Sequence, residues 1–170
     1  MISLSPVLSL GHSLPHVRAT GNLAKVKTIF ESYKKLDGVP SDVTLVVVRG
    51  KIMNAWSGRW NDEHSGYLIK VTKGMVNTGN VKFYEAILAH EFGHIINGNY
   101  DNNPCGKGYE HRKCEIAADM KGQELMARAG YNPCDASSDL KADKDHAQSK
   151  EYPSNKERVA YLDKDCHSYD

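Results

Sequence analysis

Apolar residues recur at helical spacing in three long stretches of the chain. The first covers residues 22–36, the second residues 83–97 and the third residues 110–129. In each stretch the spacing places the apolar side chains on one face of a helix. Gly98 and Gly130 directly follow the second and third stretches, in the position where a helix commonly ends. The pattern therefore predicts three helices.

Three shorter stretches are typical of β-strands. Residues 43–48 form a dense β-branched run that is bounded by proline and glycine. A second strand is predicted near residues 52–57 and a third at residues 67–72. Residues 58–66, which separate these two, are polar and rich in turn-forming residues, so we predict a loop there.

The C-terminal part of the chain carries loop and helix signals in turn. Residues 137–151 are charged and weakly apolar, which predicts a loop. Residues 154–157, Ser-Asn-Lys-Glu, form a capping box before a short apolar face, which predicts a short helix. The order of elements predicts an α+β domain whose small mixed or antiparallel sheet packs on the helix at 83–97. We expect residues 1–20 to be an N-terminal extension and residues 21–170 to form a single domain.

Composition and charge exclude two classes of partner. The 22 basic and 21 acidic residues give a formal net charge of +1, so we expect no nucleic acid. No run reaches the roughly 20 apolar residues that cross a bilayer, so we expect no integral membrane segment. Residues 1–18 lack the basic start and long apolar run of a secretory signal. This favours the cytoplasm, with the periplasm or secretion as alternatives if a leader has been removed.

The four cysteines leave two interpretations open. Cys105, Cys114, Cys134 and Cys166 form no CxxC pair, so a cysteine zinc site is not expected. An even number of cysteines permits two disulfides, with three possible pairings. Because no export signal accompanies them, we expect free thiols. Disulfides would instead indicate the periplasm or secretion.

The motif His90-Glu91-Phe92-Gly93-His94 carries the clearest chemistry. Two histidines four residues apart on a helix project from the same face and can reach one zinc ion at about 2.0–2.1 Å. Glu91 lies beside the first ligand, where it can take a proton from zinc-bound water. Apolar residues flank this polar triplet, so the helix is buried and its charged groups need a partner. We predict one Zn²⁺ per chain.

A catalytic zinc needs a third protein ligand. Glu115 lies on the next predicted helix and is followed by apolar residues, as a buried position requires. Asp119 falls one turn later, where it can accept a hydrogen bond from a ligand histidine. His111, one turn before Glu115, competes for the third position. It lies within a charged run that indicates a solvated helix start, so we favour Glu115.

Three motifs together resemble the M48 family of zinc metallopeptidases, which are gluzincins. They are residues 88–94 (LAHEFGH), 115–119 (EIAAD) and 129–133 (AGYNP). The resemblance covers about residues 40–162. It implies a zincin-like domain in which the helix after the HExxH helix carries the third ligand. It also implies peptide-bond hydrolysis.

A further match concerns the second strand. Asn54-Ala55-Trp56 resembles the Asn-Ala-Phe of this family's edge strand. Such a strand would hold an extended polypeptide through main-chain hydrogen bonds. The alternative is an ordinary strand with a tryptophan in the core.

The chain departs from the family pattern near its C-terminus. Pro153 and Arg158 match the family, but Tyr152 stands where the family has a histidine that helps to stabilise the oxyanion. A tyrosine hydroxyl can donate a comparable hydrogen bond, so we interpret Tyr152 as the oxyanion donor. The alternative is a packed surface tyrosine. Arg158 would anchor the carboxylates of the site.

These observations predict a zinc-dependent endopeptidase that binds a polypeptide substrate in extended form. Zinc held by His90, His94 and Glu115 would polarise the scissile carbonyl, and Glu91 would activate the zinc-bound water. One alternative is a catalytically inactive zinc protein that serves as a regulatory or interaction module. Another is a latent enzyme whose N-terminal residues, through His12 or His16, cap the metal.

Overall fold

The computed structural model describes residues 15–60, 65–101, 104–142 and 152–169. Its elements follow in the order α1 (Pro15–Lys34), β1 (Val43–Val48), β2 (Ala55–Arg59), β3 (Tyr67–Thr72), α2 (Lys73–Asn77), α3 (Val81–Ile96), α4 (Tyr109–Arg128), the 3-10 helix η1 (Pro133–Ser137), α5 (Ser138–Ala142), α6 (Asn155–Asp165) and the 3-10 helix η2 (Cys166–Tyr169). This order of helices and strands confirms the predicted α+β class. The alternative in which His12 caps a metal concerns a residue outside the described part of the chain.

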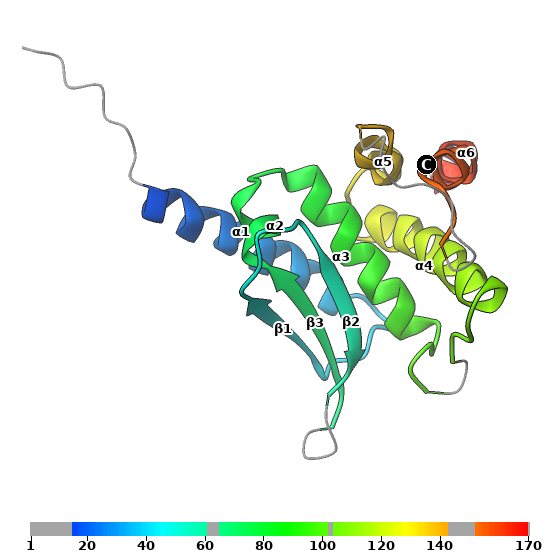
Figure 1. Cartoon of the computed structure of the whole chain (residues 1–170), viewed down its shortest axis with the longest axis horizontal. Helices are drawn as coiled ribbons and strands as arrows, with labels where there is room; N and C mark the ends of the chain where they lie inside the picture. Colours follow the sequence, from blue (N-terminus) through cyan, green and yellow to red (C-terminus); the bar gives the residue numbers. More distant parts are fainter. Residues whose placement is uncertain (1–14, 61–64, 102–103, 143–151, 170) are drawn as a thin grey trace, which may run out of the picture.

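The sheet is mixed and has the strand order β1-β3-β2. β1 pairs with β3 in parallel, and β2 pairs with β3 antiparallel, so β2 lies at one edge. Ala55 and Ser57 of β2 are opposite Val71 and Ile69 of β3 on the same face of the sheet. That face packs on α3, and Figure 1 shows α3 between the sheet and α4.

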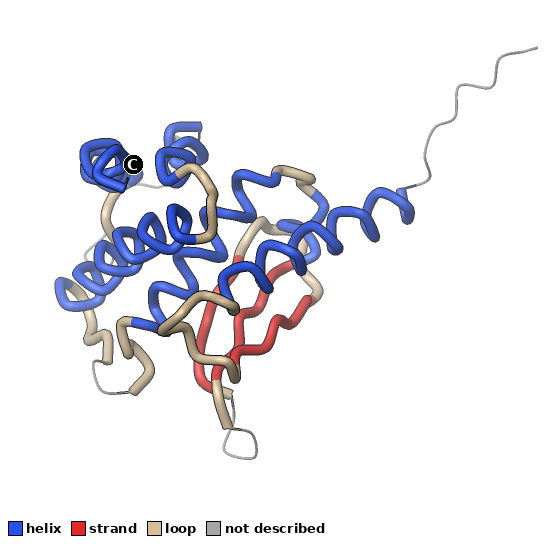
Figure 2. The backbone as a smooth tube through the Cα atoms, turned by 180° about the vertical axis from the view of Figure 1, so that it is seen from behind, coloured by secondary structure: helices blue, strands red, loops and turns tan. Residues whose placement is uncertain are grey.

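Helix α3 is the centre of the core. Its side chains Tyr84, Leu88 and Phe92 are fully buried. The Phe92 ring lies 5.3 Å from that of Phe30 and 5.8 Å from that of Tyr33, both on α1. Figure 2, which views the molecule from behind, shows α1 in front of the sheet. Because α3 has protein on all these sides, the polar residues of its HExxH motif are held in a rigid frame.

Helices α3 and α4 approach closely through small residues. A Cβ atom added at Gly93 would lie 2.5 Å from the carbonyl oxygen of Ala118, which is too close for any real contact. A Cβ atom added at Gly122 would lie 3.1 Å from the backbone nitrogen of His90. This close packing brings the backbone of α4 directly against the HExxH segment.

We expect Gly93→Ala to lower the free energy of unfolding by about 1–3 kcal/mol, because the added methyl group forces the two helices apart. Gly21→Ala on α1 is the matched control, since nothing lies within 4 Å of its added Cβ. That change should be neutral or stabilise by up to about 1 kcal/mol. Urea denaturation measures both. A Gly93→Ala protein as stable as the unmodified chain would contradict the close approach.

The residues after α4 fasten that helix to α1. Gly130 adopts a positive φ of 80°, which ends the helix and turns the chain. Tyr131 then packs its ring 5.6 Å from that of Tyr33, and its hydroxyl lies 2.9 Å from Ser32 Oγ. Pro133 is buried at the start of η1. The AGYNP motif therefore ends α4 and, through Tyr131, holds that end of the helix against α1.

Several element boundaries differ from those predicted. α1 begins at Pro15 rather than residue 22, since proline suits the first turn of a helix. β2 covers Ala55–Arg59, so the second strand is confirmed, but it begins and ends later than the predicted 52–57, and residues 58 and 59 were wrongly assigned to the loop. Ile52 is 79% exposed and lies before the strand. Pairing with β3 continues to Arg59, and this long-range pairing overrides the local turn signal.

Among the described residues, four short helices were not predicted: α2, η1, α5 and η2. α2 begins with Thr72 as its N-cap, a residue that also ends β3. α5 lies within the segment 137–151 that was expected to be a loop. At α6 the Ser154 side chain accepts from the Glu157 backbone, as the capping box predicts. The Glu157 carboxylate instead pairs with Arg112 on α4.

The expectation of free thiols was wrong. Cys105 is bonded to Cys114, and Cys134 to Cys166. The first disulfide ties the loop after α3 to α4, directly beside Glu115. The second ties η1 to the end of α6. Sequence spacing allowed this pairing but could not select it, because the partners meet only through the fold.

Candidate metal centre

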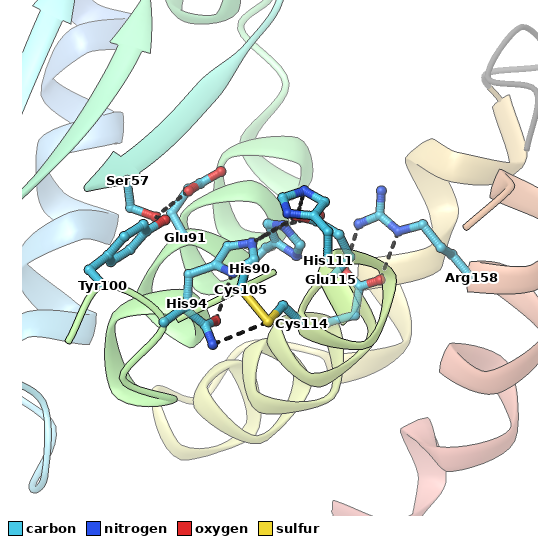
Figure 3. A network of polar contacts seen from close by, with 12 residues as sticks. Ser57, His90, Glu91, His94, Tyr100, Cys105, His111, Cys114, Glu115 and Arg158 are labelled. Carbon is cyan, nitrogen blue, oxygen red and sulfur yellow. Dashed lines mark hydrogen bonds and ion pairs between the residues drawn. A yellow bond between two sulfur atoms is a disulfide. The ribbon is translucent and has the colours of Figure 1, made fainter. Parts of the chain in front are cut away.

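Three side chains from α3 and α4 converge on one point. His90 Nε2 and His94 Nε2 lie 3.1 Å apart. The Glu115 carboxylate lies 3.4 Å from His90 Nε2 and 3.5 Å from His94 Nε2. Ligands placed about 2.0–2.1 Å from a tetrahedral zinc ion are about 3.3 Å from one another. The spacing therefore fits a single zinc ion (Figure 3).

The hydrogen bonds behind the two histidines support this reading of the site. His90 Nδ1 lies 2.7 Å from Asp119 Oδ1, and His94 Nδ1 lies 3.0 Å from Asn99 Oδ1. Both partners are acceptors, so each Nδ1 carries a proton and donates it. When both rings are neutral, each Nε2 atom carries a lone pair, and the two lone pairs point toward each other and toward the Glu115 carboxylate. Such a cluster of acceptors requires a cation, which a metal supplies.

Asp119 is held by three groups at once. Besides His90, it receives a bidentate ion pair from Arg158, with Nε and Nη2 at 2.7 and 2.6 Å. The Tyr161 hydroxyl donates to its Oδ2 at 2.5 Å. The carboxylate is 5% exposed, so its charge is balanced almost entirely by protein groups. This network, which spans α3, α4 and α6, fixes the orientation of the His90 ring.

The network strongly shifts the pKa values of its members. Burial alone lowers the pKa of His90, but the carboxylates of Asp119 and Glu115 outweigh it and raise the pKa to about 10. Burial alone raises the pKa of Asp119 and of Glu115, but the histidines lower both well below the usual range, and Arg158 adds to this for Asp119. Without a metal, these carboxylates favour a proton on His90, which adds a positive charge to that of Arg158.

Glu91 lies at the side of this cluster, on the face of α3 that meets the sheet. It is 6% exposed, and its Oε2 accepts a hydrogen bond of 2.5 Å from Ser57 Oγ on β2. Ser57 Oγ is in turn 2.9 Å from the hydroxyl of Tyr100. In Figure 3 these three residues lie on the opposite side of the histidines from Glu115 and Arg158.

A cleft of about 840 Å³ gives access to these groups. β2 forms one wall, α3 the floor, and α4 and the C-terminal helices the other wall. Its apolar part is lined by Phe83, Ala86 and Ile87 of α3, together with Met126 and Leu140. His90, Glu91, His94 and Glu115 line its polar part. A ligand in the cleft would reach the histidine–carboxylate cluster and Glu91 together.

Comparison with known proteins identifies the family. The sequence model of peptidase family M48 matches residues 22–107, half of the chain. The chain belongs to peptidase family M48. Members of this family are zinc metallopeptidases, hydrolases whose substrates are polypeptides. Neither the curated proteins nor the solved structures yielded a match.

The family match confirms the resemblance drawn from the sequence motifs. It includes His90, Glu91 and His94 but ends before Glu115. The third position of an M48 zinc site therefore rests on the geometry of this chain alone. Among the described residues, no helix has the length and apolar character to cross a bilayer.

The competing residue His111 lies close to Glu115 but outside the cluster. Its Nε2 is 3.3 Å from Glu115 Oε1 and has no hydrogen-bond partner among the described residues. The ring meets that of Tyr152 edge-on, with centroids 4.9 Å apart. Tyr152 is 51% exposed and lines the cleft.

The predicted substrate strand lies at the rim of the same cleft. Asn54, Ala55 and Trp56 all line it. Ala55 is buried, whereas Trp56 is 40% exposed and has the Lys70 ammonium 6.0 Å from its ring. The alternative of a core tryptophan was therefore wrong. The outer edge of β2 has no neighbouring strand in the described sheet.

Four residues of the site were not found from the sequence. Tyr161 follows Arg158 by one turn of α6, a spacing that could have indicated a shared partner. Asn99 and Tyr100 follow the glycine that ends α3, but nothing local shows that this turn folds back on the site. Ser57 looked like an ordinary strand residue. Its role depends on which face of the sheet covers α3.

Proposed function

We propose that this M48 chain is a zinc-dependent endopeptidase with a zincin-like catalytic domain within residues 21–170. The observation that carries the proposal is the convergence of His90, His94 and Glu115 at the floor of a cleft that also contains Glu91. The three donors fit one zinc ion, and the second nitrogen of each histidine is already engaged. Helices α3 and α4, which carry the three donors, pack closely against each other at Gly93 and Gly122. This close packing holds the donors in place.

The remaining groups suit hydrolysis of a peptide bond. Zinc, when bound, supplies Lewis-acid polarisation of a carbonyl and acidifies water. Glu91 takes a proton from water in the cleft and carries it to the leaving amine. Tyr152 donates a hydrogen bond to the oxygen on which negative charge develops. No cysteine takes part, since all four are in disulfides.

The substrate would bind as an extended polypeptide. Asn54, Ala55 and Trp56 line the cleft, and the outer edge of β2 would offer main-chain donors and acceptors to the substrate. The main-chain groups of Asn54 itself are already bonded to Thr72, so Asn54 would contact the substrate through its side chain. Binding in this way depends little on the substrate's side chains, as an endopeptidase acting on unfolded chains requires. The apolar part of the cleft beside the metal ligands would accept a large hydrophobic side chain.

The test is hydrolysis of an unfolded protein. Metal-replete chain incubated with reduced, alkylated casein should produce internal cleavage products, detected by mass spectrometry. 1,10-Phenanthroline should stop cleavage, and stoichiometric zinc should restore it. A zinc-loaded protein that releases no internal fragments would favour the alternative, a zinc-binding regulatory or interaction module. Latency through His16 would instead predict that removal of residues 1–20 starts cleavage.

Zinc binding should be coupled to proton release. Because the pKa of His90 is raised to about 10, the metal-free site holds about one proton at pH 7, and zinc must displace it. Calorimetry in buffers of different ionisation enthalpy should give release of about one proton per zinc. The apparent affinity should rise about tenfold from pH 7 to pH 8. Asp119→Asn, which removes a charge that raises this pKa, should reduce the release.

The raised pKa of His90 also makes the stability of the metal-free protein depend on pH. The pKa of His90 is higher in the folded chain than its ordinary value of 6.5. Its ion pairs therefore stabilise the fold fully below pH 6.5, and this contribution is lost as the pH rises through about 10. The melting temperature of metal-free protein should fall over that range, and that of zinc-loaded protein should fall less. Equal slopes would contradict a protonated His90.

We further propose that the protein works in an oxidising compartment. The two disulfides support this, because such bonds persist outside the reducing cytosol. The sequence alone had favoured the cytoplasm. Protein purified without reductant and then denatured should show no reactive thiols. Four reactive thiols in active material would contradict the proposal.

A further inference from the structure

We propose that Ser57 and Tyr100 form a hydroxyl relay that positions the Glu91 carboxylate for proton transfer. The inference rests on the proposed function, since it assigns partners to the general base of that reaction. Ser57 comes from the edge strand and Tyr100 from the turn after α3. Both act through Glu91 rather than on substrate, so they are positioning residues.

The place of Ser57 in the sheet is the first observation. It lies on the face that packs on α3, where its neighbours Ala55, Ile69 and Val71 are buried and apolar. A hydroxyl group on such a face is unfavourable unless it forms a hydrogen bond. Its Oγ donates to Glu91 Oε2 at 2.5 Å, the short distance of a bond to a charged acceptor.

The direction of the relay follows from counting protons. Ser57 has one hydroxyl proton, and the ionised Glu91 can only accept, so that proton points at Glu91. The Tyr100 hydroxyl, 2.9 Å from Ser57 Oγ, must then donate to Ser57. Burial raises the pKa of Tyr100 to about 12, so it keeps its proton near neutral pH. Each donor in the series strengthens the next.

The turn after α3 connects this relay to the metal ligands. Gly98 adopts a φ of 70°, which reverses the chain after α3. Asn99 then accepts from His94 Nδ1, and the next residue, Tyr100, reaches Ser57. One turn therefore sets the orientation of a metal ligand and of the general base together (Figure 3).

The relay leaves one carboxylate oxygen of the general base, Glu91, available to accept a proton. Among the described residues, only Oε2 of Glu91 takes part in a side-chain hydrogen bond. Oε1 can accept a proton while Ser57 holds the other oxygen. A carboxylate held at one oxygen has fewer orientations, so more of its population points at the reacting atoms. Loss of the relay should lower kcat without weakening substrate binding.

The test is a double-mutant cycle on kcat. Ser57→Ala should lower kcat about tenfold and leave KM within twofold, while Tyr100→Phe should lower kcat about threefold. Because Tyr100 acts only through Ser57, the double variant should match Ser57→Ala within twofold. Ser57→Thr, which keeps the hydroxyl group, should recover most of the loss. Zinc stoichiometry and melting temperature are measured for every variant. Neither should fall in proportion to the loss of kcat.

Different outcomes test the hydroxyl relay and the proposed endopeptidase function separately. If Glu91→Gln is inactive while Ser57→Ala keeps the kcat of the unmodified chain, the relay is wrong and the function stands. If losses from Ser57→Ala and Tyr100→Phe multiply in the double variant, Tyr100 does not act through Ser57, and the relay is also wrong. If Glu91→Gln hydrolyses as fast as the unmodified chain, both proposals fail.

Discussion

Glu91→Gln should reduce hydrolysis of an unfolded protein by about 10²- to 10⁴-fold while zinc remains bound. This range is the usual contribution of a general acid–base group. Glutamine has the shape of glutamate and can still meet Ser57, but it cannot take a proton from water. Neither the helix packing nor the three metal donors should change, because Glu91 is not one of the donors. The measurement is kcat/KM together with zinc content.

Glu85→Gln is the matched control for this experiment. Glu85 lies on the same helix, is partly buried, and does not line the cleft. Its replacement should leave kcat/KM within twofold. A Glu91→Gln protein that keeps full activity would show that another group supplies the proton transfer. A variant that loses zinc would instead place Glu91 among the ligands.

Glu115→Ala should weaken zinc binding by about 10²- to 10³-fold and remove activity at ordinary zinc concentrations. A protein zinc site has an apparent binding free energy of about 10–16 kcal/mol, shared among its ligands, so loss of one ligand is costly. Glu115→Gln keeps the shape of the side chain but removes its charge, and it should show a smaller loss. Competition with a fluorescent zinc chelator measures the affinity of each variant.

His111→Ala is the control that decides between the two candidates for the third position. His111 lies 3.3 Å from Glu115, one turn away on α4, but outside the group of three mutually close donors. We expect its replacement to change zinc affinity by less than about tenfold. If His111→Ala loses zinc and Glu115→Ala keeps it, the third ligand has been assigned to the wrong residue.

Local sequence signals predicted the central helices well. α3 carries its apolar residues at helical spacing, and both of its ends bear ordinary caps, Asn80 and Gly98. α4 also has its apolar residues at helical spacing and is followed by Gly130, although no side chain caps its start. Caps and spacing act over a few residues, so they can be found without knowledge of the fold. The two histidines of HExxH share a face of α3 for the same reason.

Features that depend on distant contacts could not be predicted in the same way. The disulfide partners Cys134 and Cys166 are separated by 32 residues and meet only when α6 packs on η1. Ser57 gains its role only because β2 turns that face to Glu91. The end of β2 was set by its pairing with β3, against a local turn signal.

The choice between Glu115 and His111 as the third metal ligand depends partly on local sequence signals and partly on distant contacts. Both are on one face of α4 at helical spacing, so the sequence favoured Glu115 through its apolar neighbours but did not exclude His111. The angle between α3 and α4, set by the close contact at Gly93, brings the Glu115 carboxylate to both imidazoles. A crossing angle of this kind arises from packing and leaves no local trace.

The most direct measurement is an anomalous difference map at the zinc edge from crystals of metal-replete protein. We predict one peak per chain, about 2.0–2.2 Å from His90 Nε2, His94 Nε2 and a carboxylate oxygen of Glu115. A peak bound by His111 instead of Glu115, or no peak at these histidines in protein that hydrolyses casein, would contradict the account.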